Sequence, residues 1–209
     1  MKPAVPWLGR FAGRSILFVM ATEAEYGAHL RKLIQPVITG VGPVEAAIGT
    51  TQALTALFDA GTPPDLVISL GSAGSNTQEQ GRVYQVASVS YRDMDARPLG
   101  FAKGATPFLN RPAEIELPIR LREVPAGRLS TGANIITGPA YAAIDADMVD
   151  MESFAVLRAC ESFGVPMIGL RGISDGAHDL RHYSDWTALL GQLDQKLADI
   201  IQRLDTLMP

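Results

Sequence analysis

Residues 148–176 read MVDMESFAVLRACESFGVPMIGLRGISDG. An apolar run leads to Glu152, a stretch with helical spacing follows, and a second apolar run, Met167–Leu170, leads to Asp175. A strand–helix–strand unit of this kind is almost always a right-handed crossover with parallel strands. We therefore expect Glu152 and Asp175 at one edge of a sheet. Because α/β sheets bind ligands outside the carboxyl ends of their strands, this pair of acids predicts an enzyme active site.

The same alternation of strand and helix extends along the rest of the chain. It predicts a largely parallel sheet that is covered by helices on both faces, in a single domain of residues 1–209. The expected strands are Ile16–Met20, Pro36–Val41, Leu66–Leu70, Val83–Ser90, Met148–Met151 and Met167–Leu170, and the expected helices are Glu23–Leu33, Val44–Ala60, Glu152–Phe163 and Asp185–Leu207.

Residues 91–128 break this pattern. Prolines and glycines recur throughout the segment and interrupt any long helix or strand. Long irregular stretches are uncommon inside compact domains and often form lids or interface loops. A plain surface loop is equally compatible with the sequence.

The composition is that of an ordinary globular protein. Hydrophobic residues make up 47% and charged residues 19% of 209 residues, with a net charge of -4. A chain without a basic excess is not expected to bind nucleic acid. The single cysteine, Cys160, cannot form an internal disulfide and suits a reducing compartment. Its apolar neighbours predict a core residue rather than a nucleophile.

No segment predicts contact with a membrane. The apolar run Ile16–Ala21 is too short for a signal peptide or a bilayer-spanning helix. We expect a soluble, cytoplasmic protein. The three histidines, His29, His178 and His182, lack the spacing of metal ligands, and we expect neither a metal nor a cofactor.

Small and acidic residues follow most of the expected strands. Glu25 follows the first strand, Gly40–Pro43 the second and Gly71–Ser75 the third. Each acid alone has a plain structural interpretation, because Glu25 could complement a helix dipole, while Glu152 and Asp175 could cap helices or turns. Their joint placement at one sheet edge favours a catalytic site.

In the order of these strand ends and their residues, the sequence resembles the 5′-methylthioadenosine/S-adenosylhomocysteine nucleosidase family, within the purine nucleoside phosphorylase superfamily. The resemblance extends from Ile16 to Leu207 and is strongest in Pro64–Gly74, Asp150–Glu152 and Arg171–Asp175. It implies an α/β fold, a three-layer α/β/α sandwich around a mixed, partly closed sheet, and assembly as a homodimer. It also implies hydrolysis of the N-glycosidic bond between adenine and a 5′-thio-substituted ribose.

The resemblance gives three carboxylates separate roles. Glu25 matches the glutamate that activates water, Asp175 the aspartate that protonates adenine, and Glu152 the carboxylate that holds the ribose. Such a reaction builds positive charge on the sugar, which a carboxylate stabilises. It also needs a carboxylic acid whose pKa is raised by burial, and a base for the water.

Further positions match binding residues of the family. The segment that starts at Tyr91 and contains Leu99 and Phe101 resembles a loop that closes the neighbouring subunit's pocket. The matching positions are Met151 and Arg171 near the ribose, Ile135, Ile136 and Ser174 near the adenine, Ser72 and Val41 in the water and ribose region, and Tyr183, Leu99 and Phe101 in the pocket for the 5′ group.

The choice of nucleophile and the substrate depend on smaller differences. Phosphorylases that resemble this sequence carry one arginine in each of two segments, and arginines are the usual ligands of a phosphate dianion. The matching segments here, Val67–Ser72 and Met20–Glu25, contain no arginine. Water is therefore favoured over phosphate as the nucleophile. Shortened segments at 26–40 and 104–128, and Ile135 in place of an aromatic, leave the 5′ substituent open among methylthio, homocysteinyl and deoxy groups.

Two alternatives remain at this stage. One is a purine nucleoside phosphorylase or a nucleosidase of other substrate preference. The other is a non-catalytic, adenosine-binding module, because a fold alone does not determine function. The presence of all three carboxylates disfavours the binding module.

Overall fold

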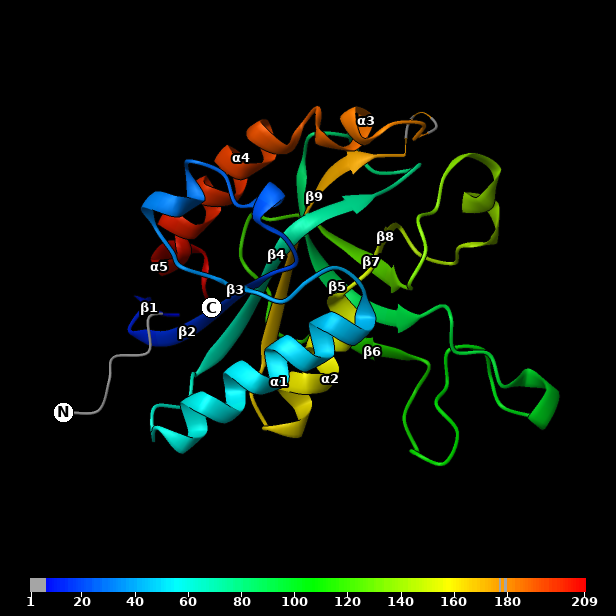
Figure 1. Ribbon diagram of the computed structural model, residues 1–209, viewed down its shortest axis with the longest axis horizontal. Helices are drawn as coiled ribbons and strands as arrows, with labels where there is room; N and C mark the ends of the chain where they lie inside the picture. Colours follow the sequence, from blue (N-terminus) through cyan, green and yellow to red (C-terminus); the bar gives the residue numbers. More distant parts are fainter. Residues whose placement is uncertain (1–6, 177, 179) are drawn as a thin grey trace.

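A computed structural model describes residues 7–176, 178 and 180–209, and shows a sheet between two layers of helices (Figure 1). The strands are β1 (Leu8–Phe11), β2 (Arg14–Met20), β3 (Val37–Ile38), β4 (Leu66–Gly74), β5 (Val83–Tyr91), β6 (Glu114–Glu116), β7 (Ala126–Thr131), β8 (Met148–Asp150) and β9 (Met167–Asp175). The α-helices are α1 (Pro43–Asp59), α2 (Ser153–Ser162), α3 (Tyr183–Thr187), α4 (Leu190–Gln202) and α5 (Leu204–Leu207). Short 3₁₀ helices are η1 (Glu23–Glu25), η2 (Leu30–Lys32), η3 (Arg97–Leu99) and η4 (Gly138–Ala143).

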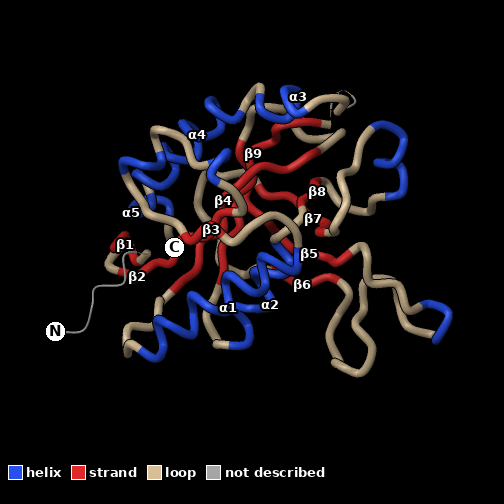
Figure 2. Tube along the Cα trace, viewed as in Figure 1, coloured by secondary structure: helices blue, strands red, loops and turns tan. Residues whose placement is uncertain are grey.

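The expected three-layer sandwich with a mixed, partly closed sheet is confirmed. Helices α1 and α2 cover one face, while α4 and α5 cover the other (Figure 1). Strand β4 pairs with β9, β9 with β5, β5 with β7, β7 with β8, and β8 with β4, so these strands close into a ring. Strands β1, β2 and β3 extend the sheet beyond β4, and β6 adds to β5 (Figure 2). Within the described residues, no helix has the length and apolar character needed to cross a bilayer.

The expected parallel alignment of the two strands around Glu152 and Asp175 is wrong. Strands β2, β3, β4 and β9 are parallel, as predicted, but β8 pairs antiparallel with β4. The crossover rule holds for strands that share an open sheet. Here ring closure turns β8 against the last residue of β4, and Gly74 pairs with Val149 on one side and with Asp175 on the other. The two acids therefore meet by closure rather than by a shared strand direction.

Two expected helices differ from the structure. The stretch Glu23–Leu33 forms only η1 and η2. Its backbone N–H groups at His29 and Leu30 donate to the carboxylate of Asp194 on α4, over 2.8 and 3.1 Å, instead of to a preceding helical turn. The expected helix Asp185–Leu207 is divided into α3, α4 and α5, although its apolar face stays buried.

The other expected elements agree more closely. Helices α1 and α2 begin and end within one residue of the prediction. Residues 91–128 contain the short strand β6 and the beginning of β7, and the part between β5 and β6 extends away from the sandwich (Figure 1). The expected strand Pro36–Val41 shrinks to the two residues of β3.

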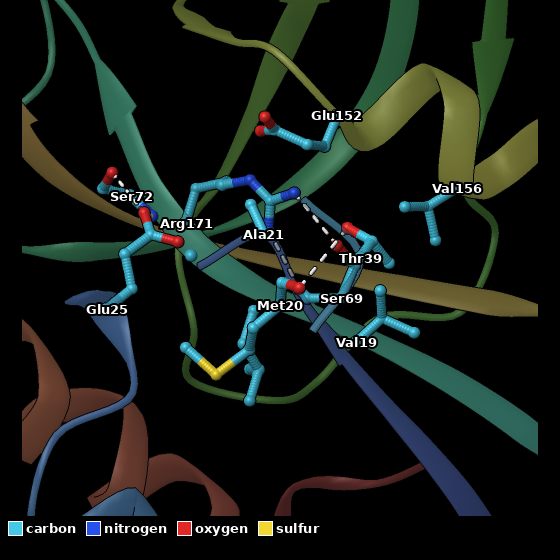
Figure 3. A pocket seen from close by; sticks show the side chains of 12 residues that line it. Val19, Met20, Ala21, Glu25, Thr39, Ser69, Ser72, Glu152, Val156 and Arg171 are labelled. Carbon is cyan, nitrogen blue, oxygen red and sulfur yellow. Dashed lines mark hydrogen bonds between the residues drawn. The ribbon is translucent and has the colours of Figure 1, made fainter. Parts of the chain in front are cut away.

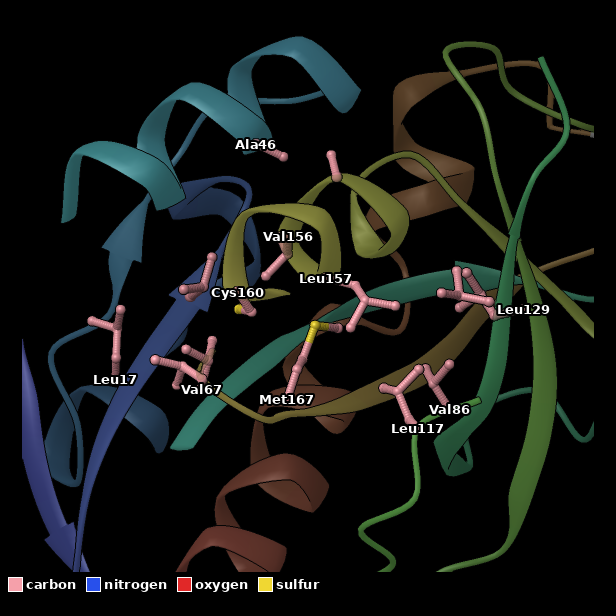
Figure 4. Packing of buried hydrophobic residues seen from close by; sticks show 14 of the residues in the cluster. Leu17, Ala46, Val67, Val86, Leu117, Leu129, Val156, Leu157, Cys160 and Met167 are labelled. Atoms are coloured by element: carbon pink, nitrogen blue, oxygen red, sulfur yellow. The ribbon is translucent and has the colours of Figure 1, made fainter. Parts of the chain in front are cut away.

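The core consists of two layers, one on each face of the sheet. Alternate residues of β2 face opposite layers: Leu17 packs towards α1 and α2, and Phe18 towards α4 and α5. Cys160 on α2 lies in the first layer, fully buried beside Val67 and Met167 (Figure 4). Burial raises the pKa of its thiol to about 12, as expected for a core residue without a nucleophilic role.

The Asp194 contacts generate a prediction for stability. Asp194 is 3% exposed, and it accepts from two backbone N–H groups and contacts the Nδ1 atom of His29 at 3.0 Å. We expect Asp194→Ala to lower the free energy of unfolding by about 2–4 kcal/mol, because two backbone N–H groups, one of them buried, lose their carboxylate acceptor. Urea denaturation measures the effect. Asp199→Ala, on the exposed side of the same helix, serves as the control and should change stability by less than about 0.5 kcal/mol.

Candidate active site

A pocket of about 510 Å³ opens at the carboxyl ends of β2, β4 and β9, a size typical of a small-ligand site. Below it lies a cavity of about 10 Å³, roughly the space of one water molecule. Glu25, Ser72 and Glu152 line both spaces, while Arg171 lines only the smaller one (Figure 3). The expected site residues that line the larger pocket are Glu25, Val41, Ser72, Ile135, Ile136, Met151, Glu152, Asp175 and Tyr183.

Glu25 is a buried carboxylate that is held by Ser72. It ends η1 and is 8% exposed, and its Oε1 atom accepts from the Ser72 backbone N–H at 2.7 Å and from the Ser72 hydroxyl at 2.5 Å. Burial raises the pKa of Glu25, although both Ser72 bonds act in the opposite direction. The helix-dipole interpretation does not account for these contacts with β4. Gly71 leaves room for the carboxylate, since a Cβ there would lie 3.2 Å from Oε2.

Glu152 reaches across the pocket instead of capping its own helix. It occupies the N-cap position of α2, but its side chain makes no capping hydrogen bond. Its Oε1 atom accepts from the backbone N–H of Gly42 at 2.8 Å. Gly42 has a φ of 97°, a conformation that favours glycine, and it precedes α1. Burial, followed by the negative charge of Asp150, raises the pKa of Glu152 to about 7.

Asp175 is the last residue of β9 and faces the pocket. The Ser174 hydroxyl donates to its Oδ1 atom at 2.5 Å, and burial raises the pKa of the carboxyl despite this bond. Gly74 lies against its other oxygen: a Cβ there would be 2.8 Å from Oδ2 and 2.4 Å from the hydroxyl of Tyr141. Ser174 itself is fully buried, so it supports Asp175 rather than lining the pocket.

Arg171 lies beneath the pocket with its guanidinium group saturated by hydrogen bonds. It is 2% exposed and pairs with Asp150 at 3.1 Å. It also donates to the hydroxyls of Ser69 and Ser153, at 3.0 and 2.8 Å, and to two backbone carbonyls. A buried ion pair of this kind persists only with such additional bonds. Arg171 therefore acts on the carboxylates from below rather than touching a ligand in the larger pocket.

Four expected residues lie in different environments. Ile136 is buried in a small cluster with Tyr141 and Val149, whereas Ile135 is 67% exposed at the pocket rim. Leu99 and Phe101 do not line the pocket of their own chain, and Leu99 is 74% exposed. Their assignment to a neighbouring subunit's pocket stays a prediction.

Two further residues that line the pocket, Trp186 and Arg92, were not among the expected site residues. Trp186 on α3 donates its indole N–H to the Ser72 hydroxyl at 3.0 Å. Arg92 donates to backbone carbonyls that include those of Asp150, at 3.0 Å, and Asn134, at 2.6 Å, and it thereby fixes the chain before Ile135. Trp186 lies within the expected helix Asp185–Leu207, and the contacts of both residues depend on tertiary structure.

Taken together, the geometry provides three carboxylates with raised pKa values around one pocket. Glu25 and Glu152 line a cavity with room for a water molecule. Asp175 pairs with Gly74, the last residue of β4. Protonated and ionised carboxyl groups in one site can donate and accept protons on the same ligand.

Comparison with known proteins agrees with this picture. The phosphorylase superfamily profile matches residues 31–204. A 5′-methylthioadenosine/S-adenosylhomocysteine nucleosidase of Actinobacillus succinogenes is 35% identical, over 66% of this chain and 65% of its own length. The enzyme of that name from Baumannia cicadellinicola is 32% identical, over 84% of this chain and 83% of its own. The chain thus spans just under two thirds of the first relative and more of the second.

Solved structures share the fold at lower identity. Futalosine hydrolase of Helicobacter pylori superposes with a TM-score of 0.74 at 19% identity, and the match covers 92% of this chain and 97% of that one. A Neisseria meningitidis 5′-methylthioadenosine/S-adenosylhomocysteine nucleosidase, in complex with methylthio-immucillin-A, superposes with 0.71 at 18%, over 90% and 98%. The expected family and fold are confirmed. The chain belongs to the phosphorylase superfamily and, within it, to the 5′-methylthioadenosine/S-adenosylhomocysteine nucleosidase family.

Proposed function

We propose that this protein hydrolyses the N-glycosidic bond of 5′-methylthioadenosine, which yields adenine and the 5′-substituted ribose. S-adenosylhomocysteine and 5′-deoxyadenosine are further candidate substrates. The observation that carries the proposal is the convergence of Glu25, Glu152 and Asp175 on one pocket. Family membership supports it, since the relatives are named for this activity. The single domain of residues 1–209 stays a prediction. The cytoplasmic location also stays a prediction.

Each carboxylate would perform a different step. Asp175 would donate a proton to the leaving adenine, which requires the carboxylic acid form, and its raised pKa supports this. Glu152 would bind the ribose hydroxyls and stabilise the positive charge that develops on the sugar. Glu25 would accept a proton from the attacking water, and its Oε2 atom would be the acceptor because both Ser72 bonds go to Oε1.

The remaining site residues would bind the substrate. Ile136 and the chain around it would frame the adenine, while the half-buried Met151 would pack against the sugar. Val41 would line the water and ribose region, and Tyr183, at the exposed side of the pocket, would contact the 5′ group. Arg171 and Ser174 would orient carboxylates, because neither lines the larger pocket.

A panel of nucleosides tests the activity directly. We expect release of free adenine from 5′-methylthioadenosine without phosphate, at a rate that added phosphate does not increase. The panel includes S-adenosylhomocysteine, 5′-deoxyadenosine, adenosine, inosine and futalosine. Base release that requires phosphate would identify a phosphorylase instead, and release from none of the nucleosides would favour a binding module.

The role of Asp175 can be tested with a nearly isosteric change. Asp175→Asn removes the transferable proton and should lower kcat by about 10²–10⁴-fold, the usual contribution of a general acid. The thermal unfolding midpoint should change little, because the side chain keeps its size at the end of β9. Near-normal turnover in this variant would contradict the assignment of Asp175 as the acid.

We also propose that the protein is a homodimer. Leu99 and Phe108 are 74% and 91% exposed in the segment between β5 and β6, which extends away from the sandwich (Figure 1). Exposed apolar side chains of this kind mark interaction surfaces. We expect the mass of a dimer by light scattering at micromolar concentration. A monomer mass would refute the proposal without affecting the proposed chemistry.

A further inference from the structure

A chain of two hydrogen bonds connects the C-terminal part of the molecule to the carboxylate of Glu25. The indole Nε1–H of Trp186 on α3 donates to the hydroxyl of Ser72 at 3.0 Å. That hydroxyl donates to Oε1 of Glu25 at 2.5 Å. The three residues come from α3, from β4 and from η1, so no local sequence pattern joins them.

The chemistry of the indole determines the direction of this chain. An indole N–H is a donor only, while a serine hydroxyl has a single proton to give. Because Ser72 accepts from Trp186, its proton is left for Glu25. Among the described residues, the Ser72 side chain bonds to Glu25 and Trp186 alone. Trp186 therefore occupies one lone pair of the hydroxyl and does not compete with Glu25 for its proton.

These hydrogen bonds determine how the carboxylate of Glu25 is held. Its Oε1 atom receives two donors from Ser72, while its Oε2 atom lies over Gly71 at the edge of the small cavity. Hydrogen bonds in series strengthen one another, so the indole donor also strengthens the bond from Ser72 to the carboxylate. Both effects favour the ionised carboxylate against the opposing effect of burial, and they fix it with Oε2 towards the small cavity.

We propose that Trp186 is a positioning residue for the base of this enzyme, and that it acts through Ser72 to hold Glu25 in orientation with Oε2 free to accept a proton from water. The proposal rests on the proposed hydrolase function. It differs from the simpler view that Trp186 is only an aromatic wall of the pocket, next to Tyr183 with ring centroids 5.4 Å apart. A wall needs the ring but not the N–H group.

Other charges also act on Glu25, and the experiment must distinguish their effects from the effect of Trp186. Arg171 on β9 favours the carboxylate, while Asp150 on β8 disfavours it, and Glu25 in turn raises the pKa of Glu152 at the start of α2. None of these three side chains bonds to Trp186 or to the Ser72 hydroxyl among the described residues. Replacement of Trp186 should leave their effects in place.

Trp186→Phe keeps an aromatic ring and removes the donor. A base must be ionised, so kcat/KM falls as the pH drops through the pKa of Glu25. With a weaker bond from Ser72 this pKa rises, and the acidic limb of the kcat/KM profile should move to higher pH by about half a unit. The kcat should fall about threefold to tenfold, the size of one hydrogen bond, and KM should change less than about twofold.

Two controls make the result specific. Trp7→Phe is the same substitution at the other tryptophan, which packs against the core and does not line the pocket, and it should leave the profile unchanged. In a Ser72→Ala background, Trp186→Phe should produce no further shift, because the connecting hydroxyl is gone. An equal effect in both backgrounds, or an unmoved acidic limb, would overturn the proposal.

A readout without turnover separates this inference from the proposed activity. Carbon-13 NMR titration of labelled glutamate, with the Glu25 signal assigned by its loss in Glu25→Gln, reports the pKa of the carboxyl directly. That pKa should be higher in Trp186→Phe than in the wild type. An unchanged pKa overturns the inference even in an active enzyme, and a raised pKa supports the contact even if the nucleoside panel shows no hydrolysis.

Discussion

The structure depends on the pairing of one residue with two strands. Gly74 ends β4 and pairs with Val149 of β8 and with Asp175 of β9. This double pairing closes the ring of strands, and it brings segments that are distant in the chain to one point. It also requires glycine, because a side chain there would collide with the Tyr141 hydroxyl and the carboxylate of Asp175. The pocket lies at the edge of the sheet beside this closure, and Gly74, Val149 and Asp175 all line it.

Burial of charge is the second constraint on the site. Glu25, Glu152 and Asp175 line one pocket, and desolvation raises the pKa of each. Arg171 is the buried counterion beneath them, but it is already paired with Asp150. The site therefore contains more carboxyl groups than basic side chains. That imbalance suits a reaction whose transition state is positively charged, because ionised carboxylates stabilise such a charge in a site shielded from water.

The sequence was sufficient for those parts of the fold that depend on local pattern. Helices α1 and α2 follow from apolar spacing and from the glycines around them, and the acidic residues follow strands whose apolar runs are continuous. The stretch Glu23–Leu33 has an equally good helical pattern, but Asp194, which lies far along the chain, binds its backbone donors. The direction of β8 depends on ring closure, and β1, β6 and β7 are short strands with weak patterns. Trp186 was visible only as an apolar residue, since its role depends on a contact with β4.

The contacts of Ser72 bear on the choice between water and phosphate. A backbone N–H and a hydroxyl at the carboxyl end of a strand are suitable donors for a bound anion. Here both donors are directed at Oε1 of Glu25, so the protein's own carboxylate occupies the place of an external anion. Arg171, the buried cation beneath these carboxylates, is saturated by its other bonds. A phosphate dianion would have to displace a buried carboxylate and remain next to it, whereas a neutral water needs only an acceptor, which Oε2 of Glu25 provides. The geometry thus favours hydrolysis for the same reason that it buries Glu25.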